Sequence, residues 1–247
     1  MDINLAFRSS DLPVKLSLVA TLDDLATPKL VAFDLDGTLI DSRGDIAAAC
    51  NHALVAAGRK PLPSETIASF VGDGARSLLV RAFGMATDAP ELDAIVDVWR
   101  AYYVAHPVDH STWMPGAREA IDACAQRGIA VALVTNKARV VTERILHALG
   151  VAKDFVLLYA GGDGPLKPSA EPMLAMARAA AIDPRDAWLV GDAEQDIGSA
   201  RAAGSLAVAV LGGFHDETRL RAARPDVLVA SLRDVATRLM KGFTPRL

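Results

Sequence analysis

Hydrophobic positions in this chain follow two alternating patterns from residue 29 onward. Short runs rich in Val, Ile, Leu and Ala alternate with Ala-rich segments in which apolar residues recur at helical spacing. The apolar runs predict strands at residues 30–35, 129–135, 155–160, 187–192, 205–210 and 226–230. Because such alternation is typical of βα units around a buried parallel sheet, we expect an α/β fold with a doubly wound parallel sheet.

One segment breaks the alternation. Between Ser42 and Trp113 the sequence contains no good strand and shows only helical pattern. We therefore expect a small α-helical cap domain at residues 45–112, inserted into a Rossmann-like catalytic core made of residues 29–44 and 113–247. The junctions at residues 41–44 and 113–116 contain Gly or Pro, so we interpret them as paired hinges of a lid.

Residues 1–28 show weak periodicity, and we interpret them as an N-terminal extension with one short helix. They lack the basic start and unbroken apolar stretch of a signal peptide, and no run elsewhere reaches membrane-spanning length. Cys50 and Cys124 have neither the spacing of a metal motif nor that of a disulfide framework. These features predict a cytoplasmic protein with no membrane partner.

Charge narrows the class of partner. The 247 residues carry a net charge of −4, with acidic and basic residues mixed along the chain. Because a basic arm or patch is absent from the sequence, we expect no nucleic-acid partner and a small molecule instead. The same features are compatible with a monomer or a homodimer.

The first predicted strand ends in Asp-x-Asp-Gly-Thr, within the segment FDLDGTLIDS at residues 33–42. Strand alternation predicts that Asp34 and Asp36 point to the same side, and Gly37 permits a tight turn beside a ligand. Ligands of parallel sheets bind beyond the carboxyl ends of the strands. This segment is therefore a candidate site, with helix capping or turn formation as the alternative role of the aspartates.

Clustered carboxylates repel a phosphomonoester, by about 4 kcal/mol per charge pair at about 4 Å in a dielectric of about 20. Mg²⁺ neutralises such a site because it binds carboxylates, waters and a phosphate oxygen in one shell. Asp192, at the end of the strand at 187–192, and Asp196, at the start of the next helix, are candidates to complete the metal site, one as a ligand and the other supporting it. Capping of that helix is the alternative role of both aspartates.

Positive charge and hydrogen-bond donors for a phosphate come from two other loops. Lys167 lies in the segment GGDGPLKPSAEP, where Pro168 and Pro172 disfavour helix, and a solvated surface lysine is the alternative. Thr135 and Asn136 close a predicted strand just where a helix is expected to begin. Their hydroxyl and amide hydrogens offer a phosphate cradle, with helix capping as the alternative.

These pieces, in this order, resemble the haloacid dehalogenase superfamily, from Lys29 to about Met240. The resemblance rests on DxDGT after the first strand, a Thr at the second motif, a Lys-Pro loop, and GDxxxD at residues 191–196. The helical insertion is similar to the small C1 cap of the phosphoglycolate phosphatase-like branch, as are the segments at residues 71–79 and 114–137.

The resemblance implies a Mg²⁺-dependent phosphatase that forms an aspartyl phosphate. It makes Asp34 the nucleophile and Asp36 the general acid and then base, while Thr135 and Lys167 bind the transferring phosphoryl group. The resemblance also implies the metal ligands: Asp34, the main-chain carbonyl of Asp36, and Asp192, with Asp196 in support. Covalent catalysis by a carboxylate divides one hard displacement into two easier ones.

Substrate choice is expected to lie in the cap, because the core contacts mainly the phosphoryl group. Gly72 and Gly74 open a predicted helix that faces the core site when the lid closes. Arg76, in the first turn of this helix, is a candidate to pair with a substrate carboxylate, with an exposed arginine as the alternative. A small phosphorylated metabolite such as 2-phosphoglycolate is the substrate implied by the resemblance.

Other functions stay open at this point. A phosphosugar mutase would use the same aspartates, and a phosphatase of this type has other possible substrates: a sugar phosphate, a nucleotide or pyrophosphate. A non-catalytic binding protein is expected to lose charged groups, yet Asp34, Asp36, Lys167 and Asp192 are all present. A dehalogenase resembles this pattern without the second aspartate, so Asp36 disfavours that activity.

Overall fold

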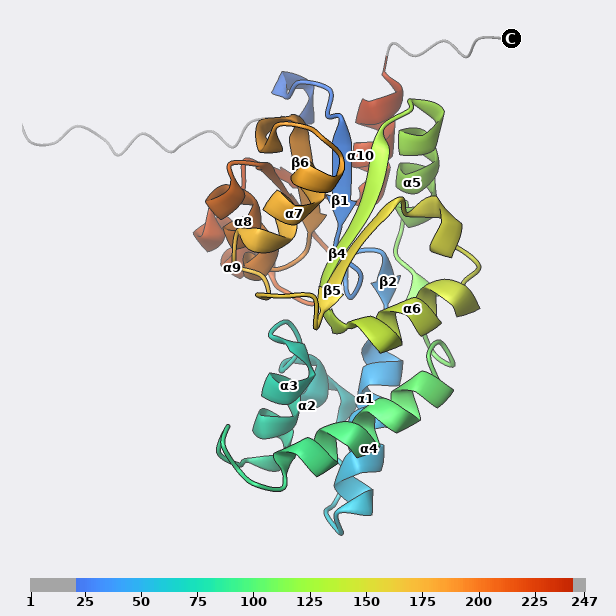
Figure 1. Ribbon diagram of the computed structural model, residues 1–247, viewed down its shortest axis with the longest axis vertical. Coiled ribbons are helices and arrows are strands. Elements are labelled where there is room, and N and C mark those ends of the chain that lie inside the picture. Colours follow the sequence, from blue (N-terminus) through green and yellow to red (C-terminus); the bar gives the residue numbers. More distant parts are fainter. Residues whose placement is uncertain (1–20, 242–247) are drawn as a thin grey trace, which may run out of the picture.

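A computed structural model describes residues 21–241, and Figure 1 shows their arrangement. Six strands form one sheet in the order β5-β4-β1-β6-β7-β8, and every neighbouring pair is parallel. The strands are β1 Leu30–Phe33, β4 Ala130–Ala138, β5 Leu157–Gly161, β6 Ala187–Gly191, β7 Leu206–Val210 and β8 Val227–Val229. The predicted α/β class and the six predicted strands are confirmed.

Helices cover both faces of the sheet because side chains alternate along each strand. On β1, Val31 and Phe33 belong to one buried cluster, and Leu30 and Ala32 belong to the other. Helices α5, α6 and α10 contribute to the first cluster, whereas α7, α8 and α9 contribute to the second. These helices are α5 Ala117–Gln126, α6 Arg139–Ala148, α7 Glu171–Ala179, α8 Glu194–Ala203, α9 Glu217–Ala223 and α10 Leu232–Met240.

Four further helices form the inserted cap, which lies below the core in Figure 1. They are α1 Arg43–Ala56, α2 Ser64–Ala68, α3 Gly74–Phe83 and α4 Leu92–Ala105. Their buried side chains, including Leu54, Leu79 and Trp99, belong to the same apolar cluster as the first face of the sheet. This shared apolar packing holds the cap against the core.

The chain enters and leaves the cap through a short antiparallel ribbon of β2 Ile40–Asp41 and β3 Thr112–Trp113. The prediction of no strand between Ser42 and Trp113 is therefore wrong at its last two residues. Two residues are too few to produce a periodic pattern, and pairing with the outgoing chain makes them a strand. The buried carboxylate of Asp45 also joins the two segments, since it accepts the backbone N–H of His110 at 2.9 Å and the Ser111 hydroxyl at 2.5 Å.

Two local predictions near the site are also wrong. Strand β4 continues to Ala138 and α6 begins at Arg139, so Thr135 and Asn136 lie within a strand and not at a helix start. Pro172 lies in the first turn of α7, where a missing backbone N–H costs nothing, so it does not keep the chain out of a helix.

The described end of the N-terminal extension packs on α10. Leu22–Asp24 form a single 3₁₀ turn, and Arg238 donates hydrogen bonds to the carbonyls of Leu22 and Leu25. The short helix was expected within residues 1–28. Apart from this turn, that prediction lies outside the described residues. Among residues 21–241, no helix combines the length and the apolar character needed to cross a membrane.

Candidate active site

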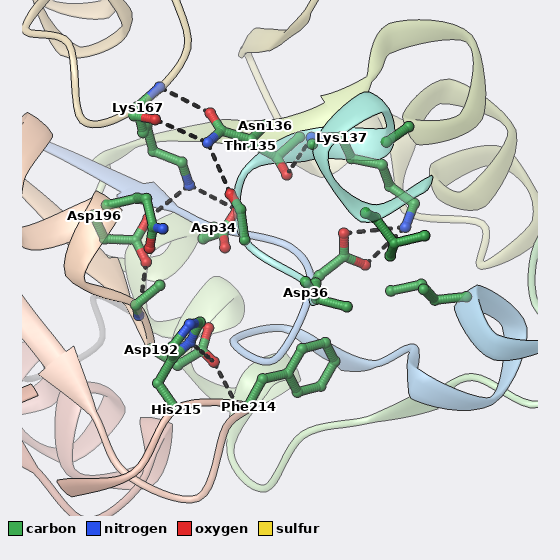
Figure 2. Close-up of a pocket in the computed structure, with 18 of the residues that line it drawn as sticks. Asp34, Asp36, Thr135, Asn136, Lys137, Lys167, Asp192, Asp196, Phe214 and His215 are labelled. Atoms are coloured by element: carbon green, nitrogen blue, oxygen red, sulfur yellow. Dashed lines mark hydrogen bonds and ion pairs between the residues drawn. The ribbon is translucent and has the colours of Figure 1, made fainter. Parts of the chain in front are cut away.

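A cavity of about 50 Å³ lies between the cap and the carboxyl edge of the sheet. Figure 2 shows that polar side chains from several core loops converge on it. Its core lining is Asp34, Asp36, Thr135, Asn136, Lys137, Ala138, Lys167, Asp192, Ala193, Gln195, Asp196, Phe214 and His215. Its cap lining is Ile46, Val71, Gly72, Gly74, Ala75, Leu78 and Trp99. The core side of the cavity is therefore polar, and the cap side is largely apolar.

Asp34 lies one residue beyond the end of β1, and its backbone N–H bonds the Val190 carbonyl at 3.0 Å. Its carboxylate is buried and lies 2.8 Å from the Nζ of Lys167. Burial raises the pKa of Asp34 to about 6, and the ammonium of Lys167 opposes this rise. The side chain is thus a desolvated carboxylate held by one cation, an arrangement suited to a nucleophile.

Asp36 also lines the cavity, but its carboxylate faces away from Lys167 and toward Lys137 (Figure 2). The Nζ of Lys137 lies 2.9 and 3.0 Å from its two oxygens. Asp34 and Asp36 lie on the same side as expected, since both line the cavity, but β1 ends at Phe33 and a turn, not strand alternation, carries Asp36 there. Asp34 and Asp36 therefore share one cavity and pair with different lysines.

Gly37 makes this turn possible. Its φ of 81° is in the left-handed region, and its N–H bonds the Ile40 carbonyl at 2.8 Å. A Cβ at this position would overlap the carboxylate of Asp192. The turn thus brings backbone against Asp192, and the hydroxyl of Thr38 donates to the same carboxylate at 2.9 Å.

Lys167 is buried and reaches into the cavity from the loop between β5 and α7. Its Nζ lies 2.7 Å from the Val134 carbonyl and 2.6 Å from Asp196, besides its contact with Asp34. Burial alone would lower the pKa of Lys167, but Asp196 and Asp34 outweigh it and hold the pKa above its ordinary value. Lys167 is therefore a fixed cation and not a solvated surface lysine.

Asp196 has two partners. It caps α8 by accepting the Ala193 N–H at 3.0 Å, and its other oxygen pairs with Lys167. Burial raises the pKa of Asp196, while Lys167 lowers it. Asp196 thus caps the helix and at the same time contacts the lysine that lies against Asp34.

Thr135 and Asn136 lie side by side in β4 but face different partners. The Thr135 side chain is buried beside the cavity, and its hydroxyl accepts the Lys137 N–H at 3.3 Å. The Asn136 amide donates to the carbonyls of Gly72 and Lys167, at 3.0 and 2.9 Å, and accepts the Lys167 N–H at 2.8 Å. The Asn136 side chain therefore joins β4, the lysine loop and the cap, and its amide hydrogens are not free to cradle a phosphate.

Three buried carboxylates lie close enough to share a metal ion. Asp34, Asp192 and Asp196 each present an oxygen within 4.8 Å of the others. Lys167 is the cation that contacts two of these three carboxylates, so negative charge remains in excess at this cluster. Asp192 is held rigidly, because it also accepts the Phe214 N–H at 2.7 Å. Hard oxygen donors with excess negative charge fit a divalent cation such as Mg²⁺.

The cap reaches the cavity through the segment that opens α3. Gly72 and Gly74 line the cavity, and Gly74 begins α3 as expected. Asp73, between them, accepts a hydrogen bond from Gln195 of α8 at 2.7 Å. Arg76 is not brought into the cavity, because its exposed side chain pairs with Asp93 on the cap surface. The exposed alternative for Arg76 is the one that the structure shows.

Three residues at or next to the cavity were not predicted from the sequence: Lys137, Tyr103 and His215. Lys137 lies two residues after Thr135, so extending the strand pattern would have placed both on one side of β4. His215 follows β7, and the rule on carboxyl-end loops would have selected it. Tyr103 contacts Lys137 from α4, and no local signal predicts a contact that depends on how the cap packs.

Comparisons with known proteins agree with this architecture. The family model described as haloacid dehalogenase-like hydrolase matches residues 31–210. A protein of Chromobacterium violaceum named phosphoglycolate phosphatase is 36% identical over 222 residues, which cover 87% of this chain and 97% of that protein. A phosphoglycolate phosphatase of Neisseria meningitidis is 36% identical over 216 residues, covering 83% and 91%.

Solved structures show the same fold. A crystal structure described as a predicted phosphoglycolate phosphatase from Haemophilus somnus superposes with a TM-score of 0.79 at 26% identity, covering 85% of this chain and 97% of that one. CbbY from Rhodobacter sphaeroides, solved with phosphate, has a TM-score of 0.71 at 22% identity, covering 83% and 95%. With the family match spanning most of the chain, this protein belongs to the haloacid dehalogenase-like hydrolases.

Proposed function

We propose that this protein is a Mg²⁺-dependent phosphatase that hydrolyses a small phosphomonoester through an aspartyl phosphate, with 2-phosphoglycolate as its preferred substrate. The observation that carries the proposal is the pairing of buried Asp34 with Lys167, at 2.8 Å, beside Asp192 and Asp196. The names of the relatives from Chromobacterium violaceum and Neisseria meningitidis support the choice of substrate.

In the first step, a carboxylate oxygen of Asp34 attacks phosphorus, and the bond from phosphorus to the leaving oxygen breaks. Asp36, in its protonated form, gives its proton to that oxygen, so the alcohol leaves neutral. Lys167 lies where it can pair with the phosphoryl oxygens, and the Thr135 hydroxyl lies beside the same cavity. The products are an aspartyl phosphate and the alcohol.

In the second step, water attacks the phosphorus of the aspartyl phosphate. Asp36, now ionised, takes a proton from this water, and the bond between phosphorus and the Asp34 oxygen breaks. Inorganic phosphate is released and both aspartates return to their starting forms. In this scheme Asp34 is the nucleophile and Asp36 carries the proton.

A metal ion would be held by Asp34, Asp192 and the main-chain carbonyl of Asp36, with Asp196 in support. When bound, Mg²⁺ would offset the repulsion between these carboxylates and a phosphate dianion. Asp34, Asp192 and Asp196 are all buried, so bulk solvent screens their charges only weakly.

The size of the cavity supports a small substrate. Its volume of about 50 Å³ is well below the several hundred cubic ångströms that pockets for larger ligands occupy. Gly72 and Gly74 bring cap backbone close to the core, and Val71, Leu78 and Trp99 fill the remaining space. A metabolite of a few heavy atoms besides the phosphate is favoured over a nucleotide.

The proposal is tested by measuring phosphate release with Mg²⁺ from 2-phosphoglycolate, sugar phosphates, nucleotides and pyrophosphate. We expect the highest kcat/KM with 2-phosphoglycolate. A preference for another small phosphomonoester would keep the chemistry and replace the substrate. Isomerisation of a sugar phosphate without net phosphate release would instead identify a mutase, and absence of turnover on every compound would overturn the proposal.

A further inference from the structure

The carboxylate of Asp36 is held by two side chains that neither Asp34 nor the metal-binding carboxylates use. Lys137 donates to both of its oxygens, and the hydroxyl of Ser42 donates to Oδ1 at 2.5 Å. Ser42 is fully buried and directly precedes α1, at the point where the chain enters the cap. The direction of this carboxylate is therefore set by partners and not by its own backbone.

Burial and a second partner hold Lys137 in this contact. Its side chain is 4% exposed, and its Nζ also lies 2.8 Å from the hydroxyl of Tyr103. Burial alone would lower the pKa of Lys137, but Asp36 and Tyr103 outweigh it, so the side chain stays charged. Lys167 already supplies the cation beside Asp34, so a second buried lysine is not needed there.

Tyr103 connects this pair to the cap. It lies in α4, is fully buried, and reaches Lys137 of β4 across the boundary between cap and core. Its ring also faces the Lys137 ammonium, with 4.3 Å between Nζ and the ring centroid. Any shift of α4 against β4 would therefore change the surroundings of Lys137 and, through it, of Asp36.

We propose that Lys137 is the positioning residue for the proton-transferring carboxylate Asp36, and that Tyr103 makes this positioning depend on the seating of the cap. This inference rests on the proposed function. Proton transfer requires heavy atoms within about 2.6–3.2 Å, a condition that a freely rotating aspartate meets only part of the time. Lys137 contacts both carboxyl oxygens and Ser42 contacts Oδ1, so Oδ2 is the oxygen that exchanges a proton with the leaving group or with water.

Leaving groups of different basicity distinguish this role from a structural one. 4-Nitrophenolate departs without a proton, whereas an alkoxide needs one from Asp36. Since kcat/KM reports the steps up to the first irreversible one, Lys137→Met should lower kcat/KM for 2-phosphoglycolate about 10²–10³-fold, in the range of general acid catalysis. For 4-nitrophenyl phosphate, the loss should stay within about tenfold.

Two further variants complete the test. Lys137→Arg, which keeps a charged donor, should recover part of the alkyl-phosphate activity. Tyr103→Phe keeps the ring and removes the hydroxyl, so it should show the same selective loss with a smaller size. Lys29→Met is the matched control, because Lys29 is exposed and pairs with Asp186 far from the cavity; its kinetics should equal wild type.

Equal losses on both substrates would overturn the inference, whether they appear in Lys137→Met or, if that variant does not fold, in Tyr103→Phe. Wild-type rates in Tyr103→Phe would show that the positioning of Asp36 does not depend on the cap. Failure of the proposed function has a different signature, because wild-type protein would then release phosphate from neither substrate.

Discussion

At the scale of single residues, Asp34 is a carboxylate removed from water. It is buried beside Asp196, and a single lysine lies against it. Its pKa of about 6 means that the folded, metal-free protein holds a proton on this carboxyl at a pH where the unfolded chain has released it. Ionisation of Asp34 therefore lowers the free energy of unfolding.

Asp34→Asn should abolish phosphate release and, without metal, stabilise the fold at pH 7. With the folded pKa above the unfolded value, the contribution of Asp34 to wild-type stability is fully present below about pH 4 and is lost as pH rises to about 6. The variant lacks this loss, so its advantage should reach at most about 3 kcal/mol at pH 7 and vanish near pH 4. Urea unfolding in EDTA at both pH values measures the effect.

The exposed Asp88→Asn is the control for this experiment, since Asp88 lies outside the cavity. It should leave turnover and unfolding unchanged. An Asp34→Asn variant that is less stable than wild type at pH 7 in EDTA would contradict the conclusion that ionised Asp34 destabilises the folded protein. Retained turnover would remove Asp34 from its role as nucleophile.

At the scale of elements, the site depends on how β4 is tied to its neighbours. Asn136 connects β4 to the loop that carries Lys167 and to the cap residue Gly72 with three hydrogen bonds. Gln195 of α8 makes a second link from core to cap through Asp73. Through backbone groups, these contacts fix the positions of the Lys167 loop and of the cap, so small shifts of either element change the cavity.

Asn136→Ala should lower both activity and stability, because it leaves the Lys167 N–H and two carbonyls without partners. We expect a loss of about 1–3 kcal/mol of unfolding free energy and a kcat/KM reduced by one to two orders of magnitude as Lys167 moves. Asn51→Ala is the matched control: Asn51 binds the backbone of Leu62 in the same two-way manner, but within the cap.

Both asparagine variants should lose stability, and only Asn136→Ala should lose turnover by more than a few-fold. Urea unfolding and steady-state phosphate release separate the two effects. Equal kinetic losses in the two variants would show that general destabilisation, and not the placement of the lysine loop, controls activity.

At the scale of the whole molecule, the core and the cap enclose a cavity that carries an excess of negative charge. Asp34 follows β1, Asp192 follows β6 and Asp196 lies in the first turn of α8, and the fold brings their carboxylates within 4.8 Å of one another. Their mutual repulsion opposes folding until a cation binds. Stability of the whole molecule should therefore depend on metal concentration.

Mg²⁺ should raise the melting temperature of the wild-type protein, and EDTA should abolish phosphate release. A ligand that binds only the folded state stabilises it by about 2.7 kcal/mol at one hundred times its Kd. Thermal unfolding at increasing Mg²⁺ measures this linkage. Asp192→Asn should remove most of the shift while keeping the fold, and a shift of wild-type size in that variant would exclude Asp192 as a ligand.

Much of this architecture was predictable from sequence. All six strands of the sheet were located within a few residues, because buried parallel strands are continuous apolar runs. The start of helix α3 near Gly74 was also predicted, because Gly74 and the apolar spacing after it are local signals. Element ends near the site were less predictable: β4 extends to Ala138 because pairing with β5 resumes there, after a shift in register.

The sequence by itself determined the order of the polar loops along a parallel sheet, and hence that Asp34, Asp36, Thr135, Lys167, Asp192 and Asp196 would gather at one edge. It did so because strand direction and loop position follow from local hydrophobic pattern. Tertiary structure alone decided which groups pair: Lys167 with Asp34, Lys137 with Asp36, and Tyr103 with Lys137. Such pairings depend on how the cap and the turns pack, and packing is a property of residues distant in sequence.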